Sequence, residues 1–156
     1  MKNVAELTFD DLEPGDRFPL GEHTVTRKEI IEFAKLYDPQ PMHLDDAGAS
    51  ANPVFERIAA SGWHTAALMN RMVGTLFGRT RIRGLAGAGV EQLRWIEPVY
   101  ADDQLQVSLE IVGVRALRSN PDRGLITMRL DARNQNDRLV ATFTLAGLFE
   151  RGPRNG

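Results

Sequence analysis

The chain has 156 residues, of which 42% are hydrophobic, and a formal net charge of −2. This length and composition predict one globular domain that can bury a hydrophobic core, and the small charge gives no electrostatic reason to expect nucleic-acid binding. The absence of cysteine excludes disulfides, zinc–thiolate sites and cysteine nucleophiles.

We expect no secretory leader and no membrane span. Asp10, Asp11 and Glu13 interrupt the N-terminal region where a leader would be apolar. No apolar run in the sequence approaches the length of a membrane-spanning helix. The sequence therefore predicts a cytoplasmic protein that binds neither membranes nor nucleic acids.

The first predicted helix follows an irregular entry over residues 1–25. Thr26 and Glu29 form a capping box, which indicates the start of a helix. Apolar residues then recur at helical spacing at Ile30, Phe33, Ala34 and Tyr37. The helix is expected to end at Asp38 or just before it, where the helix dipole should modestly raise the pKa of the Asp38 carboxyl.

The segment from Asp38 to His43 is the most informative part of the chain. Pro39 and Pro41 fix φ and push the residues before them out of the α region, so the segment is predicted to be a stiff loop. It presents a carboxylate and an imidazole, which are common general acids and bases. The spacing alone leaves two interpretations equally open: an acid–base pair, or a helix stop with a capping Asp and a surface His.

A second helix is predicted over residues 62–77, after an excursion at residues 44–60. Ser61 is its expected N-cap, and Gly78 is its expected C-terminal stop. Apolar residues cover most of the circumference of this helix, which predicts that it is buried in the middle of the domain.

The second half of the chain has the period of β-strands. Apolar and polar residues alternate over residues 104–111 and 126–133, which is typical of strands with one solvated face. Residues 134–137 are predicted to form a hairpin loop into a strand near 139–149. With residues 85–97 and a short N-terminal segment completing the sheet, the predicted fold class is α+β, an antiparallel sheet packed around one buried helix.

Several other polar residues have simpler structural explanations. His64 is more typical of a packed histidine than of a catalyst, and His23 is expected on the surface. Asp45 and Asp46 are better explained as the start of a helical turn than as metal ligands, because a metal site needs several convergent ligands. We therefore expect no metal.

Three segments resemble the MaoC-like dehydratases, the family of (R)-specific enoyl-CoA hydratases with a hotdog fold: 37–45, 60–65 and 93–99. The likeness extends over nearly the whole chain. The family signature is Asp-x-Asn-Pro-x-His, which Asp38, Pro41 and His43 match, whereas Gln40 replaces the usual Asn. The resemblance implies that residues 1–156 form a single MaoC-like hotdog domain, with an antiparallel sheet wrapped around a long central helix.

The resemblance also implies a reaction, the reversible hydration of trans-2-enoyl-CoA to (R)-3-hydroxyacyl-CoA. Asp38 would be the main water-activating base, and His43 would be the proton donor. The backbone N–H of Gly62 would polarise the thioester carbonyl, because helix N-termini carry free donors. No cofactor is implied beyond the coenzyme A of the substrate, and the family generally forms homodimers or dimer-based oligomers.

Six residues are further candidates for substrate binding: Gln40, Ser61, Trp63, Asn70, Arg79 and Arg81. Asn70 stands, by counting, where the family has a serine. The basic run at residues 79–83 has two interpretations, a solvated connection or an electrostatic collar for the phosphates of coenzyme A.

Two other functions stay open from the sequence. One is an acyl-CoA thioesterase. Thioesterases of this fold usually place a carboxylate on the central helix, whereas residues 62–77 contain no Asp or Glu, which argues against this function. The other is a non-catalytic acyl-CoA-binding protein, which the departures at Gln40 and Asn70 keep open.

Overall fold

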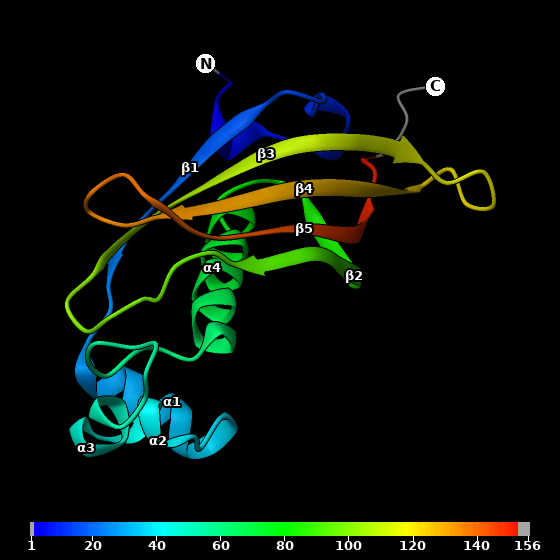
Figure 1. Ribbon diagram of the computed structural model, residues 1–156. Helices are drawn as coiled ribbons and strands as arrows, with labels where there is room; N and C mark the ends of the chain where they lie inside the picture. The colour runs from blue at the N-terminus through cyan, green and yellow to red at the C-terminus, as the bar shows by residue number, and fades with distance from the viewer. Residues whose placement is uncertain (1, 153–156) are drawn as a thin grey trace.

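The computed structural model describes residues 2–152 (Figure 1). Its strands are β1 (Arg17–Thr24), β2 (Arg83–Trp95), β3 (Gln104–Ala116), β4 (Arg123–Arg133) and β5 (Leu139–Glu150). They form one five-stranded sheet in the order β1-β3-β4-β5-β2, and every neighbouring pair is antiparallel. The predicted α+β class is confirmed, and the arrangement is that of a hotdog fold.

The predicted alternation of the strands is observed in the sheet. Over residues 104–111 of β3 and along β4 every second residue is buried, and the residues between them face the other side. The N-terminal part, predicted to be irregular, contains β1, which pairs with β3, and two short 3₁₀ turns at Val4–Glu6 and Phe9–Asp11. The expectation that an N-terminal segment completes the sheet is therefore confirmed.

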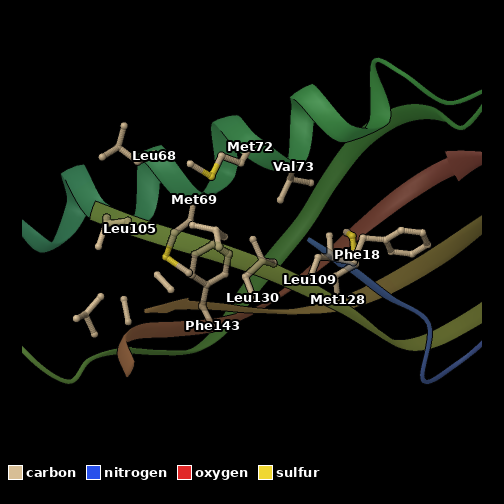
Figure 2. Packing of buried hydrophobic residues seen from close by; sticks show 14 of the residues in the cluster. Phe18, Leu68, Met69, Met72, Val73, Leu105, Leu109, Met128, Leu130 and Phe143 are labelled. Carbon is tan, nitrogen blue, oxygen red and sulfur yellow. The ribbon is translucent and has the colours of Figure 1, made fainter. Parts of the chain in front are cut away.

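The long helix α4 (Gly62–Phe77) packs against the buried face of the sheet. Figure 2 shows its apolar side chains meeting those of the strands. The residues in this contact are Leu68, Met69, Met72 and Val73 from the helix, and Phe18, Leu105, Leu109, Met128, Leu130 and Phe143 from the strands. Each such side chain, when fully buried, contributes about 1.5–3 kcal/mol to the hydrophobic driving force.

The predicted burial of α4 in the middle of the domain is observed for the face that meets the sheet, whereas the opposite face is exposed. Ala67, Asn70, Arg71 and Gly74 lie on the opposite face and are exposed. Small apolar residues such as Ala67 occur both in protein cores and on protein surfaces, so counting every apolar residue of the helix as a core residue overstated how much of α4 is buried.

Three helices form a separate group beyond one end of the sheet (Figure 1). They are α1 (Arg27–Tyr37), α2 (Pro41–Leu44) and α3 (Asp46–Ser50), and residues 27–50 are here called the helical lobe. The Thr26 hydroxyl caps α1, as predicted, and α1 ends at Tyr37 with Asp38 as its C-cap. The expected stiff loop contains one helical turn, because Pro41 occupies the first position of α2, where its missing N–H is not needed.

The strand β2 lies at one edge of the sheet, and it is exposed along most of its 13 residues. No strand among residues 2–152 pairs with its outer edge. The exposed hydrophobic residues Leu85, Val90 and Trp95 lie along it. A long, apolar, unpaired edge is a surface on which another strand can add. Within residues 2–152, no helix combines the length and the apolar character needed to cross a membrane.

Candidate active site

Asp38 and His43 face each other where α1 gives way to α2. His43 Nε2 lies 3.5 Å from Asp38 Oδ2, and the His43 side chain is buried, which contradicts the interpretation of a surface histidine. His43 Nδ1 lies 2.6 Å from the backbone oxygen of Ala59. Because a carbonyl oxygen only accepts, Nδ1 carries the proton of this bond. Nε2 is therefore the nitrogen that can exchange a proton within the site.

Both oxygens of the Asp38 carboxylate accept a hydrogen bond from a neighbouring side chain. Gln40 Nε2 donates to Oδ1 at 2.6 Å. The Ser61 hydroxyl donates to Oδ2, also at 2.6 Å. Gln40, the residue that departs from the family signature, thus reaches the carboxylate of the same motif.

The pKa of Asp38 lies below its ordinary value of 3.8, so the expectation of a raised pKa was wrong. Burial acts to raise this pKa, but the hydrogen bonds from Ser61 and Gln40 and the nearby His43 act in the opposite direction and prevail. The dipole argument considered only the end of α1, whereas the two donors come from residues outside that helix. Asp38 is therefore an anion at neutral pH.

Ser61 connects the carboxylate to the start of α4. Its side chain is fully buried, and its hydroxyl oxygen accepts from the Trp63 N–H at 3.2 Å as the N-cap of the helix. The same hydroxyl donates its proton to Asp38. The structure thus places Ser61, which was predicted to bind substrate, against the Asp38 carboxylate.

Gly62 is the first residue of α4, and its first-turn N–H has no helical acceptor. A Cβ atom added at Gly62 would lie 2.3 Å from the ring of Trp95. The space beside this glycine is therefore filled by an indole and is not left open for a ligand. The glycine is needed here for packing, while its N–H remains available at the positive end of the helix.

A cavity of about 450 Å³ joins these groups. Its polar lining includes Asp38, Gln40, His43 and Glu97, and Gly62 lines it as well. Its apolar lining comes from Val54, Phe55, Ala60, Trp63, Trp95, Ile96, Pro98, Val99 and Val140. A mostly apolar pocket with a few convergent polar groups is typical of a small-molecule site.

The two tryptophans of the pocket pack edge to face. The ring centroids of Trp63 and Trp95 are 5.1 Å apart with an interplanar angle of 78°. Both side chains are about half exposed. Trp63 was a predicted substrate-binding residue. Trp95 was not, although it lies in one of the segments that carry the family resemblance.

Three predicted substrate-binding residues lie away from this cavity. Asn70 is on the exposed face of α4. Arg79 and Arg81 follow the C-terminal end of α4, a helix of 16 residues. Such a helix is about 24 Å long, so these arginines are not beside Gly62 of the same chain. Arg79 instead lines a separate hollow of about 860 Å³ with Lys2, Phe18 and Leu76.

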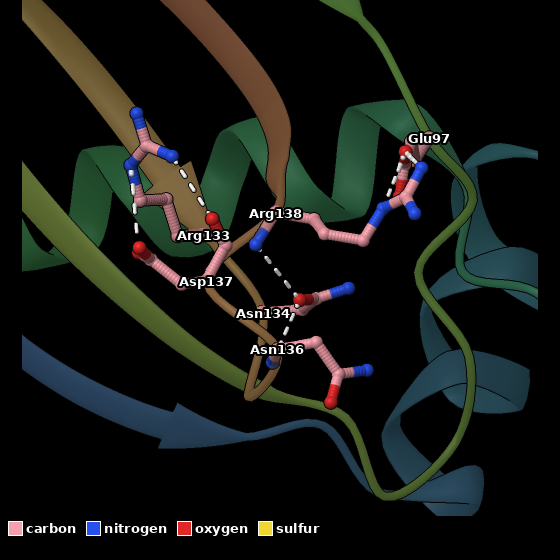
Figure 3. A network of polar contacts seen from close by, with 6 residues as sticks. All are labelled: Glu97, Arg133, Asn134, Asn136, Asp137 and Arg138. Atoms are coloured by element: carbon pink, nitrogen blue, oxygen red, sulfur yellow. Dashed lines mark hydrogen bonds and ion pairs between the residues drawn. The ribbon is translucent and has the colours of Figure 1, made fainter.

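Glu97, which lines the cavity, forms an ion pair with Arg138 (Figure 3). Arg138 Nε donates to both carboxylate oxygens of Glu97, at 2.8 and 2.9 Å, and its Nη2 contacts the same group. Arg138 follows the β4–β5 turn, in which Asn134 Oδ1 accepts from the backbone N–H groups of Asn136 and Arg138. The pair therefore connects the β4–β5 hairpin to the lining of the cavity, a connection that no local sequence signal indicated.

Comparison with known proteins gives consistent matches over most of the chain. The profile of a family described as MaoC like domain matches residues 13–132. The uncharacterized protein YdeM of Bacillus subtilis is 30% identical over 146 residues, which cover 93% of this chain and all of YdeM. The solved MaoC-like dehydratase of Rhodospirillum rubrum is 36% identical, with a TM-score of 0.81, over 94% of this chain and 99% of that one. An (R)-hydratase of A. caviae involved in PHA biosynthesis shares the fold at 24% identity and a TM-score of 0.69, over 90% of this chain and 97% of that one.

Proposed function

Because the chain belongs to the MaoC-like dehydratase family, we propose that it is a hydro-lyase that adds water reversibly to a trans-2-enoyl thioester. The product would be the (R)-3-hydroxyacyl thioester. The observation that carries this proposal is the anionic Asp38 facing the exchangeable Nε2 of a buried His43, in a pocket that begins at the N-terminus of α4.

Asp38 and His43 supply the two proton transfers of this reaction. A water molecule held against Asp38 Oδ2 gives one proton to the carboxylate as its oxygen bonds to Cβ of the substrate. His43 starts the cycle as an imidazolium, with one proton on Nδ1 toward the Ala59 carbonyl and one on Nε2, and it delivers the Nε2 proton to Cα, so that both atoms add to the same face of the double bond. Asp38 then passes its proton to His43 across the 3.5 Å between Oδ2 and Nε2, which restores both groups. The lowered pKa of Asp38 favours this last transfer.

The N-terminus of α4 supplies the third requirement, stabilisation of the charge that develops on the thioester oxygen. The Gly62 N–H is a fixed donor at the positive end of a 16-residue helix. A preorganised donor of this kind typically stabilises a transition state by about 3–4 kcal/mol. The apolar walls of the cavity, which include Trp63 and Trp95, suit the acyl chain.

We further propose that the chain acts as a homodimer through β2. The outer edge of this strand pairs with no other strand of residues 2–152, and it carries exposed apolar side chains. If two β2 strands pair antiparallel, the start of one lies across from the end of the other. The basic run at residues 79–83 would then approach the Trp95 end of the partner's strand. In that arrangement Arg79 and Arg81 would serve the phosphates of a coenzyme A bound at the neighbouring site.

The test is the hydration of crotonyl-CoA, followed by loss of the enoyl absorbance and by assay for free thiol. Asp38→Asn and His43→Ala should each lower kcat by about 100-fold or more, since general acid–base groups typically contribute 10²–10⁴-fold. Asp46→Asn is the matched control, because Asp46 is an exposed carboxylate of the same lobe whose ion-pair partner within residues 2–152 is Arg27. Losses below about tenfold in the first two variants would refute the assignment, and thiol release would indicate a thioesterase.

A further inference from the structure

A second group of titratable side chains lies outside the pocket, at the junction of β1, α1 and α4. It consists of His23, Glu29, His64 and Arg71, here called the Glu29 cluster. Glu29 Oε1 lies 2.7 Å from His23 Nε2 and 3.4 Å from His64 Nε2. Arg71 Nη2 lies 3.2 Å from His23 Nδ1. His23, expected on the surface, is half-buried in this cluster.

The proton positions in the Glu29 cluster follow from the chemistry of its ends. A guanidinium only donates, so His23 Nδ1 accepts from Arg71 and His23 Nε2–H donates to Glu29. The Glu29 carboxylate only accepts when ionised, so His64 Nε2–H also points to it. Glu29 therefore accepts from two elements, from β1 through His23 and from α4 through His64.

Charge supports the same arrangement. Burial tends to raise the pKa of Glu29, but the hydrogen bonds from His23 and Thr26 lower it overall. Burial lowers the pKa of His64 from its ordinary value of 6.5, against the opposing effect of Glu29. The cluster thus holds an ionised acceptor beside a neutral His64, whose buried Nδ1 finds no hydrogen-bond partner among residues 2–152.

A stack of rings connects this cluster to Asp38. The His64 ring stacks on Phe33, with centroids 4.9 Å apart and an interplanar angle of 12°. The ring of Phe33 in turn packs on that of Tyr37, with centroids 5.1 Å apart, and Tyr37 is the last residue of α1 before Asp38. The face of α1 that carries Glu29, Phe33 and Tyr37 therefore runs from the cluster to the catalytic carboxylate.

The helical lobe needs such a connection because few apolar contacts hold α1. Ile30 and Ala34 are the buried residues of α1. By contrast, α4 contributes four buried apolar residues to the domain, Leu68, Met69, Met72 and Val73. Asp38 comes from the end of α1 and Ser61 from the cap of α4, so the 2.6 Å bond between them depends on how these two helices are held together.

We propose that the Glu29 cluster positions Asp38 for the reaction by clamping α1 against β1 and the first turns of α4. Glu29 and His64 are thus positioning residues that act through Asp38. This inference rests on the proposed hydratase function for its kinetic test, but its structural test does not require that function.

The test compares Glu29→Leu with Glu29→Gln, which keeps an oxygen that accepts from both histidines. Glu32→Leu is the matched control, since Glu32 lies on the same helix and its one ion pair in the described part of the chain is an exposed one with Lys28 at 3.7 Å. For crotonyl-CoA we expect Glu29→Leu to lower kcat by about tenfold or more with KM changed by less than about twofold, because transition-state alignment is lost while binding is retained. Glu29→Gln should recover most of the rate, and Glu32→Leu should match the wild type.

A carbon-13 NMR titration of the Asp38 carboxyl provides the second readout. The pKa of Asp38 lies below 3.8 through its bonds to Ser61 and Gln40, so displacement of α1 in Glu29→Leu should raise it. If Glu29→Leu does not fold, His64→Phe replaces it, because the phenyl ring keeps the stack on Phe33 and removes one donor to Glu29.

The two readouts together decide the matter. A fall in kcat with a raised Asp38 pKa and recovery in Glu29→Gln supports the clamp. A folded variant with the wild-type rate, a variant that is only less thermostable, or a slower variant with an unchanged Asp38 pKa overturns it. If the wild-type protein hydrates no enoyl thioester, the proposed function fails, and the Asp38 titration alone then tests the clamp.

Discussion

The sheet with α4 and the helical lobe are held by different kinds of contact. The sheet and α4 share a continuous core of buried apolar side chains. The lobe contributes only Ile30 and Ala49 to this core among the described residues, and it also joins the rest of the domain through polar contacts: Asp38 with Ser61, His43 with the Ala59 carbonyl, and Glu29 with two histidines. Apolar contacts are non-directional, whereas hydrogen bonds require particular geometry. We infer that the first region supplies most of the stability and that the second supplies the alignment of the catalytic groups.

The largest expected effect on stability is in the core. Leu130 is fully buried between the sheet and α4. Leu130→Ala should lower the free energy of unfolding by about 2–5 kcal/mol through lost burial and a residual cavity. Urea unfolding measures this change. The kcat of the protein that remains folded should stay near the wild-type value, and a large loss of kcat would break the division between the two regions.

Ser61→Ala should show the opposite pattern, a large kinetic effect with a modest loss of stability. A hydrogen bond to a charged group contributes about 1.5–3 kcal/mol. Removing the donor should also raise the pKa of Asp38, so the acidic limb of the pH–rate profile should move to higher pH.

Asp45→Ala separates this effect from the loss of a helix cap. Asp45 Oδ1 caps α3 by accepting from the Gly48 N–H at 2.6 Å, whereas the side-chain donors to Asp38 are Gln40 and Ser61. The acidic limb should not move in this variant. An equal displacement in Asp45→Ala and Ser61→Ala would show that Ser61 acts only as a cap.

Gly62→Ala tests the packing of the indole at the start of α4. The new Cβ would lie 2.3 Å from the Trp95 ring, so one of the two must move, at a cost of about 1–3 kcal/mol for overpacking. The melting temperature and kcat should both fall. Trp95→Ala combined with Gly62→Ala should recover stability relative to Gly62→Ala alone, and failure to recover would mean that the glycine is needed for another reason.

The smallest expected effect is a pH dependence of stability that originates in the lobe. The pKa of folded His64 lies below 6.5, so the unfolded chain binds this proton first as the pH falls. Stability should therefore decrease as the pH drops below about 6.5, because the unfolded state then holds more protons. Urea unfolding of His64→Phe at several pH values should show a smaller decrease in the free energy of unfolding as the pH falls. An unchanged dependence of that free energy on pH would contradict a neutral buried His64.

Local patterns predicted the parts of the fold that local physics determines. The period-2 alternation of β3 and β4 and the capping of α1 by Thr26 are visible within a few residues. The outer face of α4 was misjudged because the polar and small residues there matter only once the position of the sheet is known. The lowered pKa of Asp38 was missed for a similar reason, since Ser61 is 23 positions away along the chain.

The candidate site was predicted in part. The resemblance pointed to Asp38, His43 and Gly62, and these residues line one cavity. It gave no sign of the Ala59 carbonyl that fixes the His43 proton, because a backbone oxygen carries no sequence signature. Likewise, the contact of Trp95 with Gly62 joins residues from two separate segments, and it appears only when β2 is placed beside α4.

The most direct measurement of the central claim is the identity of the product formed from crotonyl-CoA in deuterated water. The proposed reaction predicts (R)-3-hydroxybutyryl-CoA with one deuterium at Cα, added on the same face as the hydroxyl, and no free thiol. NMR and chiral analysis of the product determine both stereocentres. An (S) alcohol, addition to opposite faces, or release of free coenzyme A with the double bond intact would contradict the proposed roles of Asp38 and His43.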